Sequence, residues 1–358
     1  EAENGVVLAG LNHKMGYRGT VNTVINLGEE GPCIGELIGT EHRGLTYMFH
    51  MMNEARIGVG SGAVALAYTG YLHSLDYART RPQGRHPDCK DPASPQVALI
   101  EHADIRRMLL LQKAVAEGGL ALCLEAALLV DDQRTHPDEA ARRDAGLLLD
   151  FLTPILKSFL SDRALEANDA AIQIHGGAGY TRDFPVEQFW RDNRLNPIHE
   201  GANGIQAIDL MGRKLGQDDG RSFSLFVDCV AETVMAARAV DTLAGYAGDL
   251  EEMTDRFRTL AEQLLPALRQ EPRRTLANAA AFMEAAGYIT LARSWLAQAV
   301  TAERSLPAAD SAEERAFLNG KIETCGFVFA WLLPRAAPAL DLLESGDDTV
   351  FRMSADGF

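Results

Sequence analysis

Apolar and small residues recur at steps of three and four over long stretches of this chain, and this periodicity constrains the fold most. Between residues 41 and 80 they fall at Leu45, Met48, Met52, Ala55, Val59, Ala63, Leu66, Gly70 and Tyr77. Such spacing places one apolar stripe along an α-helix. The glycines at 58, 60, 62 and 70 each cost about 1 kcal/mol in helix propensity relative to alanine, so we predict close approach of neighbouring helices there.

The same periodicity continues through most of the remaining sequence. It predicts further helices over about 105–129, 138–174 and 201–216, and a short one that starts at Pro185. A proline suits that position because the first helical residue has no hydrogen bond to lose. From about residue 222 onward we predict three or four more amphipathic helices, with breaks near Gly248, 271–272, Pro307 and Pro334.

The first part of the chain has a different character. Residues 1–38 contain short β-branched and apolar runs, "VVLAGLN" and "TVNTVINL", separated by the Gly and Asn of turns. These runs are too few to close a sheet, so we interpret them as the last strands of a β domain. The prediction is a mainly α fold in three parts: the end of a β domain over 1–40, a helical bundle over 41–220, and a helical extension over 221–358.

Charge and cysteine content argue against several classes of protein. Asp and Glu outnumber Lys and Arg 50 to 34, which gives a net charge of −16. Such a surface repels nucleic acids and anionic membranes at long range, so we expect neither as a partner. The five cysteines show no CxxC or metal-binding spacing, which indicates reduced thiols, no metal site and a cytoplasmic location. We expect no apolar run that spans a bilayer and no signal peptide.

The segment "NPIHEGANGIQ", residues 196–206, carries the strongest chemical signal. Its single carboxylate, Glu200, is flanked by Ile198, Ile205 and small residues. An apolar surrounding raises the pKa of a carboxyl group, which suits a general base that works near neutral pH. The alternative is an ordinary acidic residue that interacts favourably with the N-terminus of the following helix.

Neighbouring features also allow plainer interpretations. "QIHGGAGY" is either a helix C-cap or, because its glycines let a ligand approach the backbone, a phosphate-binding turn. His175 and His199 are either structural histidines or ligands. Arg191 and Arg194 are by default paired with the nearby acidic side chains.

Longer segments resemble the acyl-CoA dehydrogenases. The segment "QIHGGAGYTRDFPVEQFWRDNRLNPIHEGANGIQ" contains three motifs of this family in order: Gln-x-x-Gly-Gly-x-Gly, Pro-Val-Glu and Arg-Asp. They are followed by "HEGA", which corresponds to the family's Tyr-Glu-Gly-Thr motif. "MMNEARIGVGSGAVALAYTGYLHSLDYARTRPQGR" resembles the first helix of its C-terminal domain, and "LNHKMGYRGTVNTVINLGE" the last strands of its middle β domain. Beyond residue 221 the chain resembles the extra C-terminal domain of the larger bacterial members, the branch that includes 3-methylmercaptopropionyl-CoA dehydrogenase. The motifs occur in order, so the resemblance covers essentially the whole chain.

This resemblance implies FAD-dependent α,β-dehydrogenation of an acyl-CoA thioester. Glu200 matches the glutamate that takes the α-proton while hydride leaves the β-carbon for flavin N5. The backbone N–H of Glu200 and the adjacent Gly201 match the substrate-binding positions. Arg81 matches an arginine that reaches the FAD phosphates, usually from a neighbouring subunit. The remaining FAD-contacting positions are matched by Gln173, Ile174, His175, Gly176, Gly177, Ala202, Asn203 and Gly204.

The chain departs from the family pattern in several ways. His199 stands where a tyrosine is usual, and Ala202 replaces a threonine, so one hydroxyl contact to the cofactor is lost. The Pro-rich turn after Arg81 is longer than in small family members. The family's N-terminal helical domain and most of its β domain have no counterpart here, so we expect a fragment, or a second polypeptide that supplies them. We therefore expect the chain to be inactive alone.

The implied partners are an acyl-CoA thioester, an electron-transferring flavoprotein or other electron acceptor, and further copies of the chain in a homodimer or homotetramer. An alternative from another class is a non-catalytic helical assembly module that retains the family scaffold and the glutamate. A third interpretation, a nucleic-acid-associated flavoprotein relative, is disfavoured by the net charge of −16. The acyl chain and the electron acceptor are left open.

Overall fold

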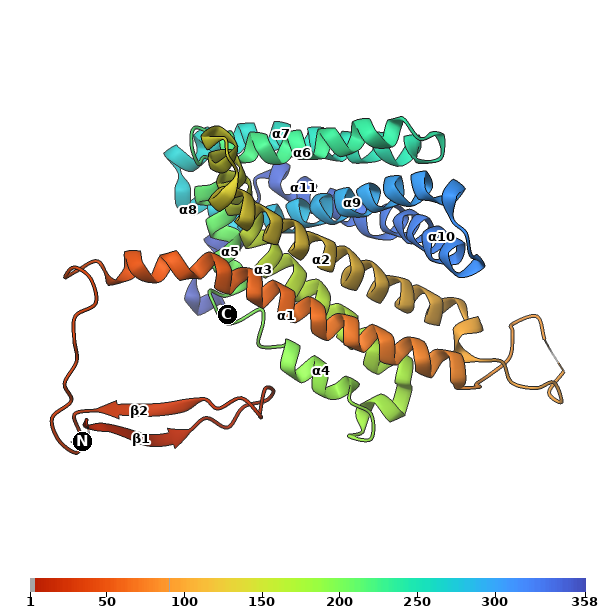
Figure 1. Cartoon of the computed structure of the whole chain (residues 1–358), viewed down its shortest axis with the longest axis horizontal. Helices are drawn as coiled ribbons and strands as arrows, with labels where there is room; N and C mark the ends of the chain where they lie inside the picture. The colour runs from red at the N-terminus through yellow and green to blue at the C-terminus, as the bar shows by residue number, and fades with distance from the viewer. Residues whose placement is uncertain (1–3, 90) are drawn as a thin grey trace.

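Three long helices run together through the computed structural model, which describes residues 4–89 and 91–358 (Figure 1). They are α1 (Gly44–Thr80), α2 (Ala103–Thr135) and α3 (Glu139–His175), and each contacts the other two. Each buries much of the small and apolar stripe seen in the sequence. The predicted helices over 41–80, 105–129 and 138–174 are therefore confirmed within a few residues.

Two of the four glycines singled out in the sequence of α1 mark close contact with α3. A Cβ atom on Gly60 would lie 2.7 Å from the carbonyl oxygen of Leu156, and one on Gly70 would lie 2.7 Å from Nδ2 of Asn168. The prediction of close approach is wrong at positions 58 and 62, where an added Cβ would meet no atom within 4 Å. These two glycines point away from the packed face, which the periodicity of the sequence did not resolve.

A β-hairpin precedes the helices. Strands β1 (Val6–Leu11) and β2 (Thr23–Leu27) pair antiparallel, with Val6 opposite Leu27 and an irregularity between Leu8 and Gly10. Apolar strand residues stay exposed, Leu8 at 61% and Leu27 at 69%. As predicted, these strands do not close a sheet within the described residues, and a lone two-stranded ribbon is marginally stable.

The loop of this hairpin is attached to the helix α4 (Val186–Asn193). The backbone N–H of Tyr17 donates to the Asp192 carboxylate at 2.6 Å, and the Arg191 guanidinium donates to the carbonyl oxygen of Met15 at 2.8 Å. Arg191 also pairs with Glu187 one turn earlier, so the default interpretation of this arginine is correct. The hairpin is thereby fixed close to the segment that carries Glu200.

The second half of the chain packs on the side of the bundle opposite α4 and the hairpin (Figure 1). Its main helices are α6 (Arg221–Arg238), α7 (Ala244–Gln270), α9 (Ala279–Ser305), α10 (Ala312–Phe327) and α11 (Ala336–Ser345). One hydrophobic cluster continues from α1–α3 into these helices, for example from Leu156 to Phe282. The bundle and the extension thus share a core, and the division at residues 40 and 220 stays a prediction.

The breaks in the extension follow the prolines more closely than the glycine. Pro272, Pro307 and Pro334 each lie in the first turn of a short helical segment, as predicted. The predicted break near Gly248 is wrong, because this residue lies inside α7. Its neighbours Ala247 and Leu250 are fully buried, and that packing outweighs the low helix propensity of glycine.

One helical stretch, 312–345, is long and apolar enough by composition to cross a membrane. We expected no such run, so the expectation from the sequence is wrong on this point. In the fold, 44% of its most apolar window is buried inside the protein, and Val328 and Leu332 lie in the core. A core helix meets the same criterion, so this feature is weak evidence for a membrane.

Candidate active site

Glu200 lies in a strained turn between α4 and α5 (Asn203–Asp209). Its φ is +54° and that of Gly201 is +87°, a left-handed conformation that is uncommon for a residue with a side chain. The buried Gln206 amide donates to the carbonyl oxygens of Glu200, at 3.0 Å, and of Gly201, at 3.4 Å. A φ of +87° favours glycine at position 201, and a Cβ there would also lie 2.7 Å from that amide nitrogen.

The Glu200 side chain is exposed to solvent. Its neighbours Ile198 and Ile205 are 54% and 56% exposed, so the predicted apolar surrounding is wrong for the described part of the chain. The apolar side chains are present, but no described residue packs over them to exclude water. The backbone N–H of Glu200 donates no hydrogen bond within residues 4–89 and 91–358, which leaves it available to a ligand.

A ladder of buried asparagines supports the segment before Glu200, and the sequence analysis missed it. Asn168 donates to the carbonyl oxygen of Leu66 at 2.9 Å, and Asn193 donates to Asn168 at 2.6 Å. Asn196 donates to Asn193 at 2.8 Å, and Nε2 of His199 lies 3.2 Å from Asn196. The only signal in the sequence is "DNRLNPIHE", where two asparagines stand three residues apart beside apolar positions.

Replacing the middle amide of this ladder should destabilise the fold. In Asn193→Ala, the buried Asn168 and Asn196 side chains each lose a partner, and an unsatisfied buried group costs roughly 1–3 kcal/mol. We expect the free energy of unfolding, measured by urea titration, to fall by at least about 2 kcal/mol. Asn319→Ala, at an exposed position on α10, is the control, expected to change it by no more than about 0.5 kcal/mol. Equal losses in the two variants would contradict a supporting role.

Both candidate histidines are held by contacts within the fold. His175 stacks on Tyr77 with ring centroids 4.3 Å apart, and its Nδ1 lies 2.8 Å from the carbonyl oxygen of Ala171. Burial lowers the pKa of His175. Burial also lowers the pKa of His199, and the charge of Lys157 lowers it further while Glu200 opposes the shift. These contacts favour the structural interpretation of both residues.

The segment predicted to contact FAD, 173–177, ends α3. Gly176 has a φ of +59° and its N–H bonds to the carbonyl oxygen of Gln173, which is a helix C-cap. Gln173, Gly176 and Gly177 are exposed. Ile174 and His175 are 2% and 4% exposed, so their side chains face the core, and contact with FAD at these two positions stays a prediction for the backbone.

Arg81 follows the last residue of α1 with a free side chain. Its guanidinium is exposed, and it makes no hydrogen bond or ion pair with any residue that the structure describes. Arg85, in the same turn, donates to the carbonyl oxygens of Pro92 and Ser94, both at 2.6 Å. The loop therefore occupies Arg85 and leaves Arg81 able to bind an anion.

The predicted FAD-contacting residues 202–204 stand at the start of α5. Ala202 and Gly204 are exposed. The Asn203 side chain turns inward, where its Oδ1 accepts from the Lys157 ammonium at 3.0 Å and its Nδ2 donates to the Ser158 carbonyl at 3.2 Å. Contact between Asn203 and FAD therefore stays a prediction for the backbone of this residue. Lys157, which donates a hydrogen bond to the Asn203 side chain, was not among the predicted site residues.

The predicted residues form two separate groups. Asn203 contacts α3 at Ser161, whereas Gln173 lies 12 residues further along that helix, roughly 18 Å away at 1.5 Å per residue. Arg81 belongs with the distant group, because Tyr77, one turn before it, stacks on His175. In Figure 1 the C-terminal end of α1 lies at the right and α5 at the left of the bundle.

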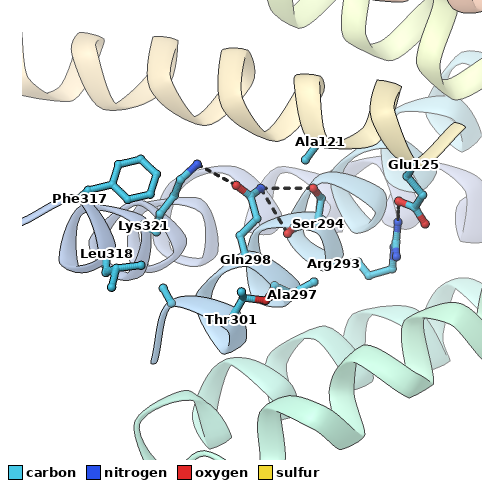
Figure 2. Close-up of a pocket in the computed structure, with 11 residues that line it drawn as sticks. Ala121, Glu125, Arg293, Ser294, Ala297, Gln298, Thr301, Phe317, Leu318 and Lys321 are labelled. Atoms are coloured by element: carbon cyan, nitrogen blue, oxygen red, sulfur yellow. Dashed lines mark hydrogen bonds and ion pairs between the residues drawn. The ribbon is translucent and has the colours of Figure 1, made fainter. Parts of the chain in front are cut away.

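A pocket of about 340 Å³ lies between α2, α9 and α10, and no predicted site residue lines it (Figure 2). Its polar side chains pair with one another: Gln298 with Lys321 and Ser294, and Arg293 with Glu125. Within the described ranges, no cluster of His, Cys, Asp and Glu side chains is arranged to hold a metal ion. The candidate site therefore rests on the Glu200 turn and the two predicted groups around α3.

Comparisons with known proteins match both helical parts. A family model described as "Acyl-CoA dehydrogenase, C-terminal domain" matches residues 42–215, and one described as "Acetyl-CoA dehydrogenase C-terminal like" matches 226–354. The 3-methylmercaptopropionyl-CoA dehydrogenase of Ruegeria pomeroyi is 37% identical over 341 residues. The chain belongs to the acyl-CoA dehydrogenase family. The resemblance noted in the sequence is thereby confirmed.

This acyl-CoA dehydrogenase family chain spans less than two thirds of its relatives. The alignment covers 94% of the chain and 56% of the Ruegeria enzyme. For the broad-specificity linear acyl-CoA dehydrogenase FadE5 of Mycobacterium tuberculosis, 30% identical over 374 residues, it covers 99% and 60%.

Two solved structures share the fold. An acyl-CoA dehydrogenase from Bacillus anthracis complexed with FAD has a TM-score of 0.67 at 17% identity and covers 98% of this chain and 60% of its own. Caenorhabditis elegans ACDH-11 in complex with C11-CoA has a TM-score of 0.70 at 17% identity, with 97% and 55% covered. The predicted mainly α fold, a C-terminal helical bundle plus a helical extension, is confirmed.

Proposed function

We propose that the protein containing this chain oxidises an acyl-CoA thioester at its α,β carbons with Glu200 as the base. The observation that carries the proposal is the Glu200–Gly201 turn, with φ values of +54° and +87°. Backbone strain of this kind persists only where the surroundings fix it, and it gathers at functional sites. Here it presents an exposed carboxylate beside a backbone N–H that has no acceptor within the described chain.

The chemistry assigned to these groups is a proton abstraction beside a polarised carbonyl. The Glu200 carboxylate accepts the α-proton, and its backbone N–H donates to the thioester oxygen, where negative charge develops as the proton leaves. Gly201 has no side chain to crowd the substrate. FAD, when bound, supplies the acceptor for the hydride that leaves the β-carbon.

Several described residues fit FAD. The Arg81 guanidinium, which pairs with no described residue, suits a phosphate, and Gly177 is exposed, with open space where a Cβ would stand. Ala202 and Gly204 leave an exposed backbone beside the base. Because the two groups lie roughly 18 Å apart along α3, we propose that Arg81 serves an FAD bound mainly by a neighbouring subunit.

The proposed partners follow from the same function. They are an acyl-CoA thioester, an electron-transferring flavoprotein or another acceptor, and identical subunits in a homodimer or homotetramer in the cytoplasm.

Helix α2 carries an exposed apolar stripe formed by Leu120, Leu124 and Leu128, which are 45%, 59% and 65% exposed. This stripe supports further burial on assembly. A stable interface buries roughly 1,200–2,000 Å², so sedimentation at micromolar concentration should show an oligomer, and a monomer alone would count against it.

Flavin reduction tests the function. The chain, extended by the N-terminal part that its relatives carry, is loaded with FAD and mixed anaerobically with a panel of acyl-CoA thioesters. Loss of flavin absorbance with at least one thioester is expected. If none reduces the flavin although FAD binds, the alternative of a non-catalytic assembly module is favoured instead.

A further inference from the structure

Lys157 is buried with fewer partners than its charge requires. Its side chain is 0% exposed, and the ammonium donates one hydrogen bond, to Asn203 at 3.0 Å. An ammonium has three N–H donors, and no carboxylate among the described residues lies within ion-pair distance of this one. Lys214, also buried, pairs with the Asp150 carboxylate at 3.0 Å. A buried cation without a counter-ion is costly, so stability alone does not account for Lys157.

The group that Lys157 holds belongs to the turn that carries Glu200. The backbone N–H of Asn203 donates to the carbonyl oxygen of Pro197 at 3.0 Å, which closes the loop 197–203 around the glutamate. The Asn203 side chain is bonded to Lys157 and to Ser158 on α3. The loop is thus attached to α3 through Asn203 and, from its other side, to α5 through Gln206.

Charged groups on α3, on α1 and in the Glu200 turn act on Lys157. Burial lowers its pKa to about 8, with Asp162 of α3 and Glu200 opposing the shift and Arg56 of α1 adding to it. The charge of Lys157 in turn lowers the pKa of His199. The ammonium therefore interacts electrically with the base and with the residue before it.

We propose that Lys157 is a positioning residue for Glu200, whose buried ammonium fixes Asn203 and with it the left-handed turn that presents the carboxylate. The inference rests on the proposed function of Glu200. The sequence signal for this role is a single charged residue within an apolar run, Lys157 in "LTPILKSFL". Only the fold shows that the ammonium of this lysine bonds Asn203, 46 positions away.

The test compares Lys157→Met with Lys214→Met in the 358-residue chain. Hydrogen–deuterium exchange of the amides in 198–206 is measured by mass spectrometry. In Lys157→Met we expect exchange there to rise roughly tenfold, because the loop loses its attachment to α3 through the ammonium. In Lys214→Met, exchange in 198–206 should not change, although the protein loses stability. Unchanged exchange in Lys157→Met would overturn the proposal.

A pH series adds a readout that packing alone would not move. The pKa of Lys157 is about 8 in the fold against 10.5 for a free lysine, so between these values the unfolded chain binds more protons and stability rises with pH. The pKa of Tyr71 is raised to about 12, so this residue makes stability fall as the pH rises. Both the wild type and Lys157→Met contain Tyr71, so the difference between their stabilities isolates the contribution of the lysine. Between pH 8 and pH 10, the folding equilibrium constant of the wild type, divided by that of Lys157→Met, should rise at least roughly tenfold.

An experiment on the unmutated chain covers the case in which Lys157→Met fails to fold. With ¹³C-labelled lysine and ¹⁵N-labelled glycine, NMR follows the Lys157 side chain and the Gly201 amide as pH rises. The Gly201 signal should shift with the midpoint of Lys157. A Gly201 signal that stays constant while Lys157 titrates would overturn the proposal. Neither readout involves flavin or substrate, so this result is independent of whether Glu200 proves to be the base.

Discussion

Glu200→Gln is expected to lower the turnover of the intact enzyme by at least ~100-fold, the usual scale of a general-base contribution. Glutamine keeps the size and hydrogen bonding of the side chain but cannot accept the α-proton. The strained turn is held through backbone carbonyls by Gln206, so it should persist in the variant. Turnover is measured with an acyl-CoA thioester, and the flavin content by its visible absorbance, which should be nearly unchanged.

Glu187→Gln is the matched control for this prediction. Glu187 lies on the neighbouring α4 and pairs with Arg191, and the Arg191 guanidinium lowers the pKa of its carboxyl group. It belongs to neither predicted group of site residues, so its removal should change turnover by less than roughly threefold. A Glu200→Gln enzyme that works at near-normal rates would place the base elsewhere in the molecule.

The 358-residue chain alone should fold yet hold FAD weakly and fail to oxidise acyl-CoA thioesters. The described residues leave Glu200, Ile198 and Ile205 exposed to water, and water weakens the polarisation that makes the α-proton removable. The chain spans less than two thirds of the two relatives described above, and we expect the part that it does not cover to add contacts to the flavin ring. Each 1.4 kcal/mol of lost interaction costs about tenfold in affinity. The measurements are circular dichroism, an FAD titration and an assay with a panel of thioesters.

Arg81→Ala in the same chain tests whether Arg81 contributes to the weak FAD binding that remains. If the chain holds FAD through its phosphate-facing end, the variant should bind it more weakly still, because a charge-assisted hydrogen bond contributes roughly 1.5–3 kcal/mol. The extended chain, with the N-terminal part of its relatives, is the positive control and should regain both binding and turnover. A 358-residue protein that is yellow and turns over at ordinary enzyme rates would refute the prediction.

The sequence by itself determined the helices, the family and the position of the candidate base. Helix periodicity is a local property, so α1, α2 and α3 were predicted within a few residues. The prolines at 272, 307 and 334 predicted breaks because each removes a backbone donor wherever it stands. Glu200 and Arg81 were recognised from the order of motifs, which does not depend on three-dimensional contacts.

The tertiary structure decided which of these side chains are exposed and which are buried. Ile174 and His175 stand in the motif, but the packing of α3 on α1 turns both side chains into the core. Asn203 turns toward Lys157, and the asparagine ladder joins Leu66 to Asn196. The contacts of Asn203 with Lys157 and of Asn168 with Leu66 join residues that the chain separates by dozens of positions, and local periodicity contains no information about such pairs. Burial and hydrogen-bond partners therefore followed only from the fold.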